Sequence, residues 1–230
     1  MPRAGRIVVP GLAHHVIQRG NRKQAIFFDD ADRRTYVSML AEACARHATA
    51  CLAWCLMDNH VHLILVPADA DGLRGVIASV HTRYSQHVNR KQELSGHLFQ
   101  GRFASYAMDD AHLMAAVRYV ENNPVAAGLV RSAEGWRWSS ARAHVGRGTD
   151  GLTDVDALGK HVPNWRAMLA RGLEAGEEDE AVERGLRSGR PIGDAAWLES
   201  VGHAPRPPGR RGRPPAANKW DKINGGQSPI

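Results

Sequence analysis

The chain has 230 residues, 43% of them hydrophobic, which suits one domain with a real core, or one domain plus an appendage. Its 30 lysines and arginines against 24 acidic residues give a net charge of +6, which favours a polyanionic partner such as nucleic acid. The three cysteines form no CxxC pair, which argues against a secreted disulfide scaffold and fits a reducing cytosol. Without a signal peptide or a membrane-length apolar run, we expect a cytoplasmic protein with no membrane partner.

The beginning of the chain predicts a strand followed by a helix. Residues 12–18 are expected to form the strand, which leads into a basic loop at 19–23 and a short apolar segment at 25–28. Asp29 then opens an acidic turn that caps a helix. The apolar stripe of this helix consists of Tyr36, Met39, Leu40, Ala43 and Cys44.

A hairpin and a second helix come next. Residues 50–57 predict an apolar strand, which a tight turn at Asp58-Asn59 joins to an alternating strand ending at Val66. The amphipathic helix that follows has an apolar stripe of Leu73, Val76, Ile77, Val80, Tyr84 and Val88.

One more strand and one more helix complete the regular pattern. Residues 103–108 predict the strand, and Asp109 caps a helix with Leu113, Ala116, Val117 and Val120 toward the core. We expect this helix to stop near Asn122-Asn123-Pro124, because a residue before proline disfavours α geometry. The order β-α-β-β-α-β plus a helix predicts an α+β fold, the ferredoxin-like split βαβ arrangement with an antiparallel sheet.

The remainder of the chain differs in character. Glycine-rich residues 146–151 predict a linker, and residues 146–202 as a whole predict a small, mostly helical extension. Residues 203–230 form a basic tail rich in Pro, Gly and Arg, which we expect to be disordered when free. Within it, the segment around Arg211 and Arg213 is similar to an AT-hook core, although a non-specific basic tail is the simpler interpretation.

The sequence His60-Val61-His62 lies at the start of the alternating strand. Strand side chains two positions apart share a face, so both imidazoles should point the same way. Two convergent imidazoles can begin a divalent-metal site. They can equally be a solvated or hydrogen-bonded pair, and spacing alone does not decide between the two.

Tyrosine is scarce in this chain, and the four are Tyr36, Tyr84, Tyr106 and Tyr119. Tyr36 and Tyr84 lie on apolar stripes, and Tyr106 lies in a predicted strand. Tyr119 lies roughly 110° from the centre of the apolar stripe of its helix, in the same sector as Asn123. It is either a tyrosine at the rim of the core or a functional residue.

Two segments resemble the single-tyrosine HUH transposases, whose signature is a histidine, a bulky apolar residue and a histidine. Residues 57–64 contain this signature, and residues 118–130 resemble the RYIxxNPVRAGLV segment of the REP-associated tyrosine transposases. Segments 15–22, 96–103 and 136–141 match that group too, in the same order. Residues 1–145 are thereby identified as an HUH transposase domain. One departure is Ala126, where the family has arginine, which removes a positive charge near the catalytic helix.

The resemblance implies a DNA strand-transfer reaction. Tyr119 would attack a phosphodiester of single-stranded DNA and form a 5′-phosphotyrosine link. His60 and His62 would hold Mg²⁺ or Mn²⁺, with Asn123 as third ligand and Asn122 as a possible substitute. The implied partners are single-stranded DNA hairpins of the REP type, bound by a monomer or a homodimer in the cytoplasm, at the nucleoid.

Basic and aromatic residues supply the expected DNA contacts. For each arginine alone, a solvated surface charge is the simpler interpretation. The residues with the strongest expectation are Arg19, Arg22, Lys23, Arg83, Phe99, Arg102, Arg211 and Arg213, with Arg90, Lys91, Phe103 and Tyr106 as further possibilities.

Two other functions remain open. A domesticated relative could bind hairpin DNA without cutting it, although the complete set of Tyr119, His60, His62 and Asn123 argues against this. A metal hydrolase is the third class, but such enzymes usually carry further clustered ligands, as in HxHxDH, and none follow His62.

Overall fold

A four-stranded antiparallel sheet lies at the centre of the protein, for which a computed structural model describes residues 6–159, 162–171 and 177–203. The strands are β1 (His14–Arg19), β2 (Thr49–Met57), β3 (His60–Pro67) and β4 (Ala104–Ala107). Their order is β2-β3-β1-β4, and each neighbouring pair is antiparallel. The predicted ferredoxin-like α+β fold is therefore confirmed.

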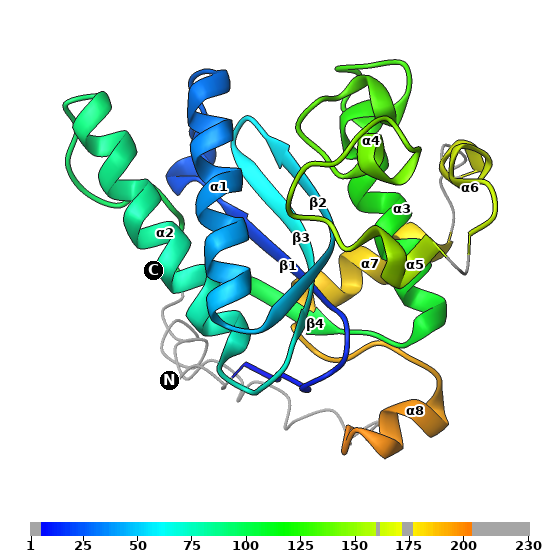
Figure 1. The fold of residues 1–230 in the computed structure, drawn as a ribbon. Coiled ribbons are helices and arrows are strands. Elements are labelled where there is room, and N and C mark those ends of the chain that lie inside the picture. The colour runs from blue at the N-terminus through cyan, green and yellow to red at the C-terminus, as the bar shows by residue number, and fades with distance from the viewer. Residues whose placement is uncertain (1–5, 160–161, 172–176, 204–230) are drawn as a thin grey trace, which may run out of the picture.

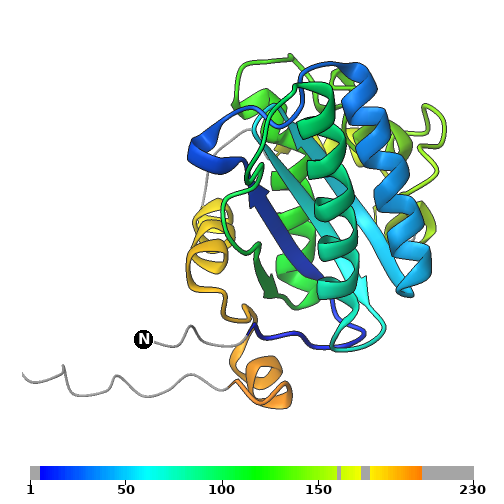
Figure 2. The ribbon, with the colours of Figure 1, turned by 90° about the vertical axis from the view of Figure 1, so that its left-hand side faces the viewer.

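Two long helices, α1 (Asp30–Arg46) and α2 (Gly72–Lys91), cover one face of the sheet (Figures 1 and 2). The Asp29 carboxylate caps α1 by accepting the backbone N–H of Asp32, as the sequence predicts. Tyr36, Leu40 and Tyr84 are fully buried between these helices and the sheet. The predicted apolar stripes of both helices thus form the core on this face.

The helix α3 (Asp110–Ala126) packs on the opposite face, capped by Asp109. Beside it lie α6 (Trp165–Arg171) and α7 (Glu177–Ser188), and α7 also contacts β1 and β4. Figure 1 shows the sheet between the α1 and α2 layer and this second group of helices. The remaining elements are η1 (Asn21–Lys23), η2 (Ala133–Gly135), α4 (Ala141–His144), α5 (Val155–Gly159) and α8 (Ala195–Ser200).

The predicted end of the third helix is wrong, because α3 continues through Pro124 to Ala126. Proline removes only one backbone donor here, two residues before the helix ends. The true terminator is Gly128, which has φ +70° and donates its N–H to the carbonyl of Val125. Leu129 donates to Pro124, which completes a Schellman-type end.

The predicted glycine-rich linker, residues 146–151, leads into a segment that packs against the edge strand β2. The backbone N–H of Asp154 donates to the carbonyl of Cys51, and the Asp150 carboxylate accepts the indole N–H of Trp54 at 3.0 Å. Residues 138–140 extend the same edge, because Ser140 donates its backbone N–H to the carbonyl of Trp54, and Leu56 donates its own to the carbonyl of Trp138. Most of the predicted disordered tail, residues 204–230, lies outside the described residues.

Across the part of the chain that the structure describes, no helix has the length and apolar character needed to cross a bilayer.

Candidate active site

His60 and His62 project from β3 on the face of the sheet opposite α1 and α2. Their ring centroids are 4.9 Å apart, so the predicted common direction of the two side chains is present. His62 is buried, with 1% of its surface exposed, and His60 is half-buried. The two imidazoles therefore form a pair at the sheet surface, at the end of β3 next to the hairpin turn.

A third histidine, His15, joins this pair from β1. Its Nε2 lies 2.9 Å from Nδ1 of His62, and its Nδ1 lies 3.2 Å from the hydroxyl of Tyr106 on β4. In the β1–β3 register His62 faces Ile17, which makes His15 a diagonal neighbour on the same face. Sequence analysis assigned His15 no role, because strand register cannot be deduced from a single strand pattern.

These contacts engage the Nδ1 atom of each β3 histidine. The side-chain oxygen of Asn59 accepts a hydrogen bond from His60 Nδ1 at 2.6 Å, and His15 engages Nδ1 of His62. The Nε2 atom of His62 is buried without a hydrogen-bond partner. A buried polar atom without a partner is costly unless something else binds it, as a metal would.

All three histidines are held in the neutral form that a metal ligand requires. Burial lowers the pKa of His15 to about 3. Burial also lowers the pKa of His60 to about 4. The charge of Arg19 lowers this pKa further, whereas the hydrogen bond with Asn123 raises it. The pKa of His62 is also lowered well below its usual value, first by burial and then by its histidine neighbours.

The helix α3 brings Tyr119 and Asn123 to the same place. The Tyr119 ring is 5.7 Å from that of His62 and 6.1 Å from that of His15, between centroids. Asn123, one helical turn further on, hydrogen-bonds His60 through its side chain. The adjacent Asn122 points elsewhere, since its amide donates to the buried carbonyl of Leu169 at 2.8 Å. Asn123, and not Asn122, is thus the amide beside the histidines.

The helix α7 encloses the other side of Tyr119. A cavity of about 250 Å³ lies there, lined by Ile17, Arg19, Tyr119, Glu183, Leu186 and Arg187. The sequence predicts a mostly helical extension over residues 146–202, but it does not predict where α7 packs, because short amphipathic helices can pack on many surfaces. Arg19 is the predicted DNA contact that lies at this cavity.

The other predicted DNA contacts lie in different surroundings. Arg22 and Lys23 are exposed on η1, in left-handed backbone geometry, and Arg102 is exposed near β4. Arg83 is on α2, paired with Glu42 at 2.7 Å. Arg211 and Arg213 lie outside the described residues.

The aromatic residues predicted to stack on bases are occupied within the protein. Phe99 is 9% exposed and stacks on His81, with ring centroids 4.0 Å apart. Phe103 lies under the guanidinium of Arg6, and Tyr106 is buried against His15. None of these rings is presented to a base in this structure.

A metal at this site would have two imidazoles and an amide oxygen as protein ligands. Among the described residues there is no cluster of three or more His, Cys, Asp or Glu side chains that could hold one. The orphaned Nε2 of His62 and the neutral state of both histidines nevertheless fit a divalent ion with Asn123 as the third donor.

Comparisons with known proteins identify the family and the fold. The profile of the family described as "Transposase IS200 like" matches residues 8–123, just over half of the chain. No curated protein matches the chain. A solved REP-associated tyrosine transposase bound to a REP hairpin is 19% identical, with a TM-score of 0.53, over 68% of this chain and 90% of that one. A crystallised protein of Deinococcus radiodurans assigned to the transposases is also 19% identical, with a TM-score of 0.37, over 53% of this chain and 97% of that one.

The first of these structures has the same fold, and the family match confirms the transposase resemblance seen in the sequence. The chain belongs to the IS200-like transposase family.

Proposed function

We propose that this transposase cleaves and rejoins single-stranded DNA, with Tyr119 as the nucleophile. The observation that carries the proposal is the meeting of Tyr119 and Asn123, one turn apart on α3, with His60 and His62 on β3. Because Tyr119 and Asn123 lie on one rigid helix, the nucleophile and a metal ligand can be positioned at the same phosphate.

The reaction is a transesterification. The Tyr119 oxygen attacks phosphorus, the bond between phosphorus and the 3′ oxygen breaks, and the DNA 5′ phosphate becomes linked to tyrosine. The phenol loses a proton and the departing 3′ oxygen gains one, so no water and no nucleotide are consumed. Attack by a 3′-hydroxyl on the phosphotyrosine reverses these changes and rejoins a strand.

His60, His62 and Asn123 would hold Mg²⁺ or Mn²⁺. When bound, the ion polarises the scissile phosphate and offsets negative charge on its oxygens. His15 and Asn59 engage the Nδ1 atoms of the two histidines and thereby hold the rings in one orientation. Burial keeps the imidazoles unprotonated near neutral pH, so they remain ready to bind a cation.

The proposed substrate is a single-stranded DNA hairpin in the cytoplasm. Support comes from the excess positive charge, from Arg19 beside the Tyr119 cavity, and from the hairpin bound to the structural relative. Arg22, Lys23 and Arg102 are exposed cations that would contact phosphates. Each chain has one Tyr119, so strand exchange requires either two successive uses of one site or two subunits.

A covalent-adduct assay tests the proposal. The protein is incubated with labelled REP-like hairpin DNA and Mn²⁺, and a denaturing gel reports any DNA that stays attached to protein. We expect an adduct with the wild type and with Tyr36→Phe, which removes a phenol on the opposite face of the sheet. Tyr119→Phe should form no adduct while still binding the hairpin, and excess chelator should prevent the adduct.

An undiminished adduct with Tyr119→Phe would refute the nucleophile assignment. Hairpin binding by a wild type that forms no adduct would favour a DNA-binding protein without cleavage.

A further inference from the structure

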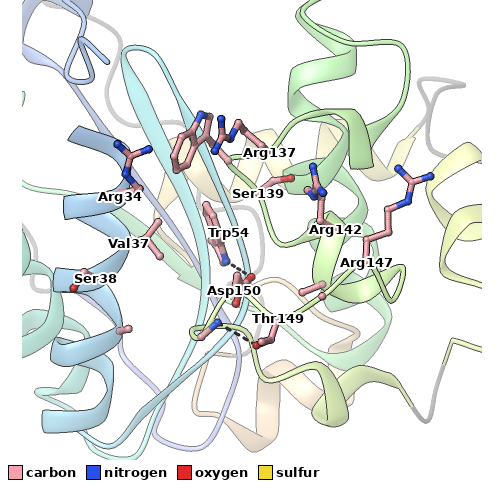
Figure 3. A pocket seen from close by; sticks show the side chains of 15 residues that line it. Arg34, Val37, Ser38, Trp54, Arg137, Ser139, Arg142, Arg147, Thr149 and Asp150 are labelled. Carbon is pink, nitrogen blue, oxygen red and sulfur yellow. Dashed lines mark hydrogen bonds between the residues drawn. The ribbon is translucent and has the colours of Figure 1, made fainter. Parts of the chain in front are cut away.

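A basic cavity lies at the β2 edge of the sheet, away from the candidate active site (Figure 3). Its volume is about 470 Å³, within the range of small-ligand sites. Trp54, Ser139 and Asp150 line its interior, and four arginines come from the elements around it. We call it the edge cavity. The arginines are Arg34 on α1, Arg137, Arg142 on α4 and Arg147.

The edge cavity and the cavity at Tyr119 share no lining residue. Cys55 lies directly opposite His62 in the β2–β3 register and therefore points toward the active-site face. Its neighbour Trp54 points the other way and packs in the core beneath α1 and α2. A ligand of the edge cavity is therefore held by groups that do not belong to the Tyr119 site.

The positive charges of the edge cavity are mostly uncompensated. Arg34, Arg142 and Arg147 are exposed and form no ion pair with any carboxylate of the described residues. Arg137 pairs with Asp30 at 3.0 Å and lies over the Trp138 ring. The guanidinium groups around the edge cavity attract an anion, and each can donate two hydrogen bonds to a phosphate.

The one carboxylate that lines the edge cavity is already engaged. Asp150 accepts hydrogen bonds from the Trp54 indole and the Thr153 hydroxyl through one oxygen, and from two backbone N–H groups through the other. These four bonds fold residues 150–153 against β2. Asp150 therefore shapes the edge cavity while its acceptor capacity is used inside the protein.

We propose that the edge cavity binds successive backbone phosphates of single-stranded DNA that flanks the segment engaged at Tyr119. In Figure 3, Arg34 lies on the α1 side, and Arg142 and Arg147 lie on the opposite side. Guanidinium groups on two sides of one cavity suit a strand, because a strand offers several phosphates in sequence. The choice of DNA as the strand rests on the proposed function.

Binding of an oligonucleotide without divalent metal tests this proposal separately from cleavage. The probe is fluorescent oligothymidylate, whose affinity is measured by anisotropy across a range of salt concentrations. For single strands the slope of log K against log salt changes by about 0.7 per phosphate contact, so Arg142→Gln/Arg147→Gln should lower it by about 1.4. Both side chains are exposed and unpaired, and a thermal unfolding curve verifies that the double variant folds.

The matched control is Arg46→Gln/Arg74→Gln. It removes the same charge from exposed residues whose ion pairs are local, with Glu42 and Asp71. This control should retain the wild-type slope. An unchanged slope in the edge-cavity variant, or an equal fall in the control, would overturn the proposal.

Two further measurements, of inorganic phosphate binding and of the Tyr119 adduct, distinguish strand binding from phosphate binding and from cleavage. If inorganic phosphate binds wild type but not the edge-cavity variant, while both bind oligothymidylate with equal slopes, the site takes free phosphate and the proposal fails. If the slope falls as expected but wild type forms no Tyr119 adduct, the edge cavity stands as a strand-binding site and the cleavage function is refuted.

Discussion

His15 Nε2 lies 2.9 Å from His62 Nδ1, so a histidine on β1 holds the ring of a proposed metal ligand on β3. Among the described residues, the Tyr106 hydroxyl is the hydrogen-bond partner of His15 Nδ1, at 3.2 Å. If His15 Nδ1 carries its proton toward Tyr106, its Nε2 accepts the proton of His62 Nδ1. That tautomer leaves Nε2 of His62, the buried atom without a partner, as the metal-binding nitrogen.

This relationship predicts that His15→Phe weakens metal binding. Losing the partner of a ligating histidine typically costs 10–100-fold in metal affinity, and we expect a loss of about that size here. His15→Gln keeps a hydrogen-bond acceptor on a side chain of similar reach and should restore much of the affinity. Calorimetric titration with Mn²⁺ in the absence of DNA measures both. Wild-type affinity in His15→Phe would show that His15 does not orient the ligand.

The neighbouring amides Asn122 and Asn123 should have different effects when replaced by alanine. Asn123→Ala removes the proposed third ligand, so Mn²⁺ affinity and adduct formation should fall while the unfolding free energy changes little. Asn122→Ala leaves the buried Leu169 carbonyl unsatisfied and should cost about 1–3 kcal/mol of stability with metal affinity intact. Denaturant unfolding and Mn²⁺ titration of both variants distinguish the two roles. The reverse pattern would move the third ligand to Asn122.

The structural features that could be predicted from the sequence are those that depend on local residue patterns. The order of strands and helices, the Asp29 and Asp109 caps and the common direction of His60 and His62 all follow from periodicity and capping rules. The end of α3 differs from the prediction, because Pro124 near the end of a helix removes only one backbone hydrogen bond. The helix ends instead where Gly128 adopts the left-handed conformation.

Long-range features could not be predicted in the same way. The contact between His15 and His62 depends on register between two strands, and the place of α7 depends on packing of a short helix. The edge cavity joins α1 to residues more than a hundred positions later, which no local pattern reports. The burial of Phe99 likewise follows from its tertiary neighbour His81.

Protein stability should decrease with acidity through His14. This buried ring donates from Nδ1 to the Leu12 carbonyl and accepts the Val9 backbone N–H at Nε2, so protonation would break the second bond. Burial lowers its pKa to about 4 from 6.5. Because the folded pKa lies below the unfolded one, the stabilisation is complete above pH 6.5 and is lost as the pH falls toward 4.

The contribution of His14 can be isolated by comparing wild type with His14→Gln. In that pH window a fully linked histidine contributes a slope of about 1.4 kcal/mol per pH unit to the free energy of unfolding. The variant, which cannot titrate at this position, should show a shallower decline by about this amount. Urea unfolding at several pH values between 7 and 4 measures the difference. Parallel profiles would mean that His14 is not the linked group.

A buried network around Glu121 should stabilise α3 near the candidate active site. The carboxylate of Glu121 accepts hydrogen bonds from Ser140 at 2.5 Å, His144 at 2.6 Å and the Trp165 indole at 2.7 Å. These partners come from the segment after α3, so Glu121 ties α3 to α4 and α6. Because Glu121 is fully buried, removing one partner leaves a carboxyl oxygen without one of its hydrogen bonds, and water cannot replace it.

We therefore expect His144→Ala to cost about 1–3 kcal/mol in the free energy of unfolding, the range for leaving a buried polar group without its hydrogen-bond partner. Adding Glu121→Gln to His144→Ala replaces the carboxyl group with an amide, which is less costly to bury without a full set of hydrogen bonds, so the double variant should be more stable than His144→Ala alone. A double-mutant cycle by denaturant unfolding gives the coupling between the two residues. Additive effects would contradict the network, because independent residues show no coupling. A coupling of about 1 kcal/mol or more would establish that Glu121 and His144 act as a pair in holding α3.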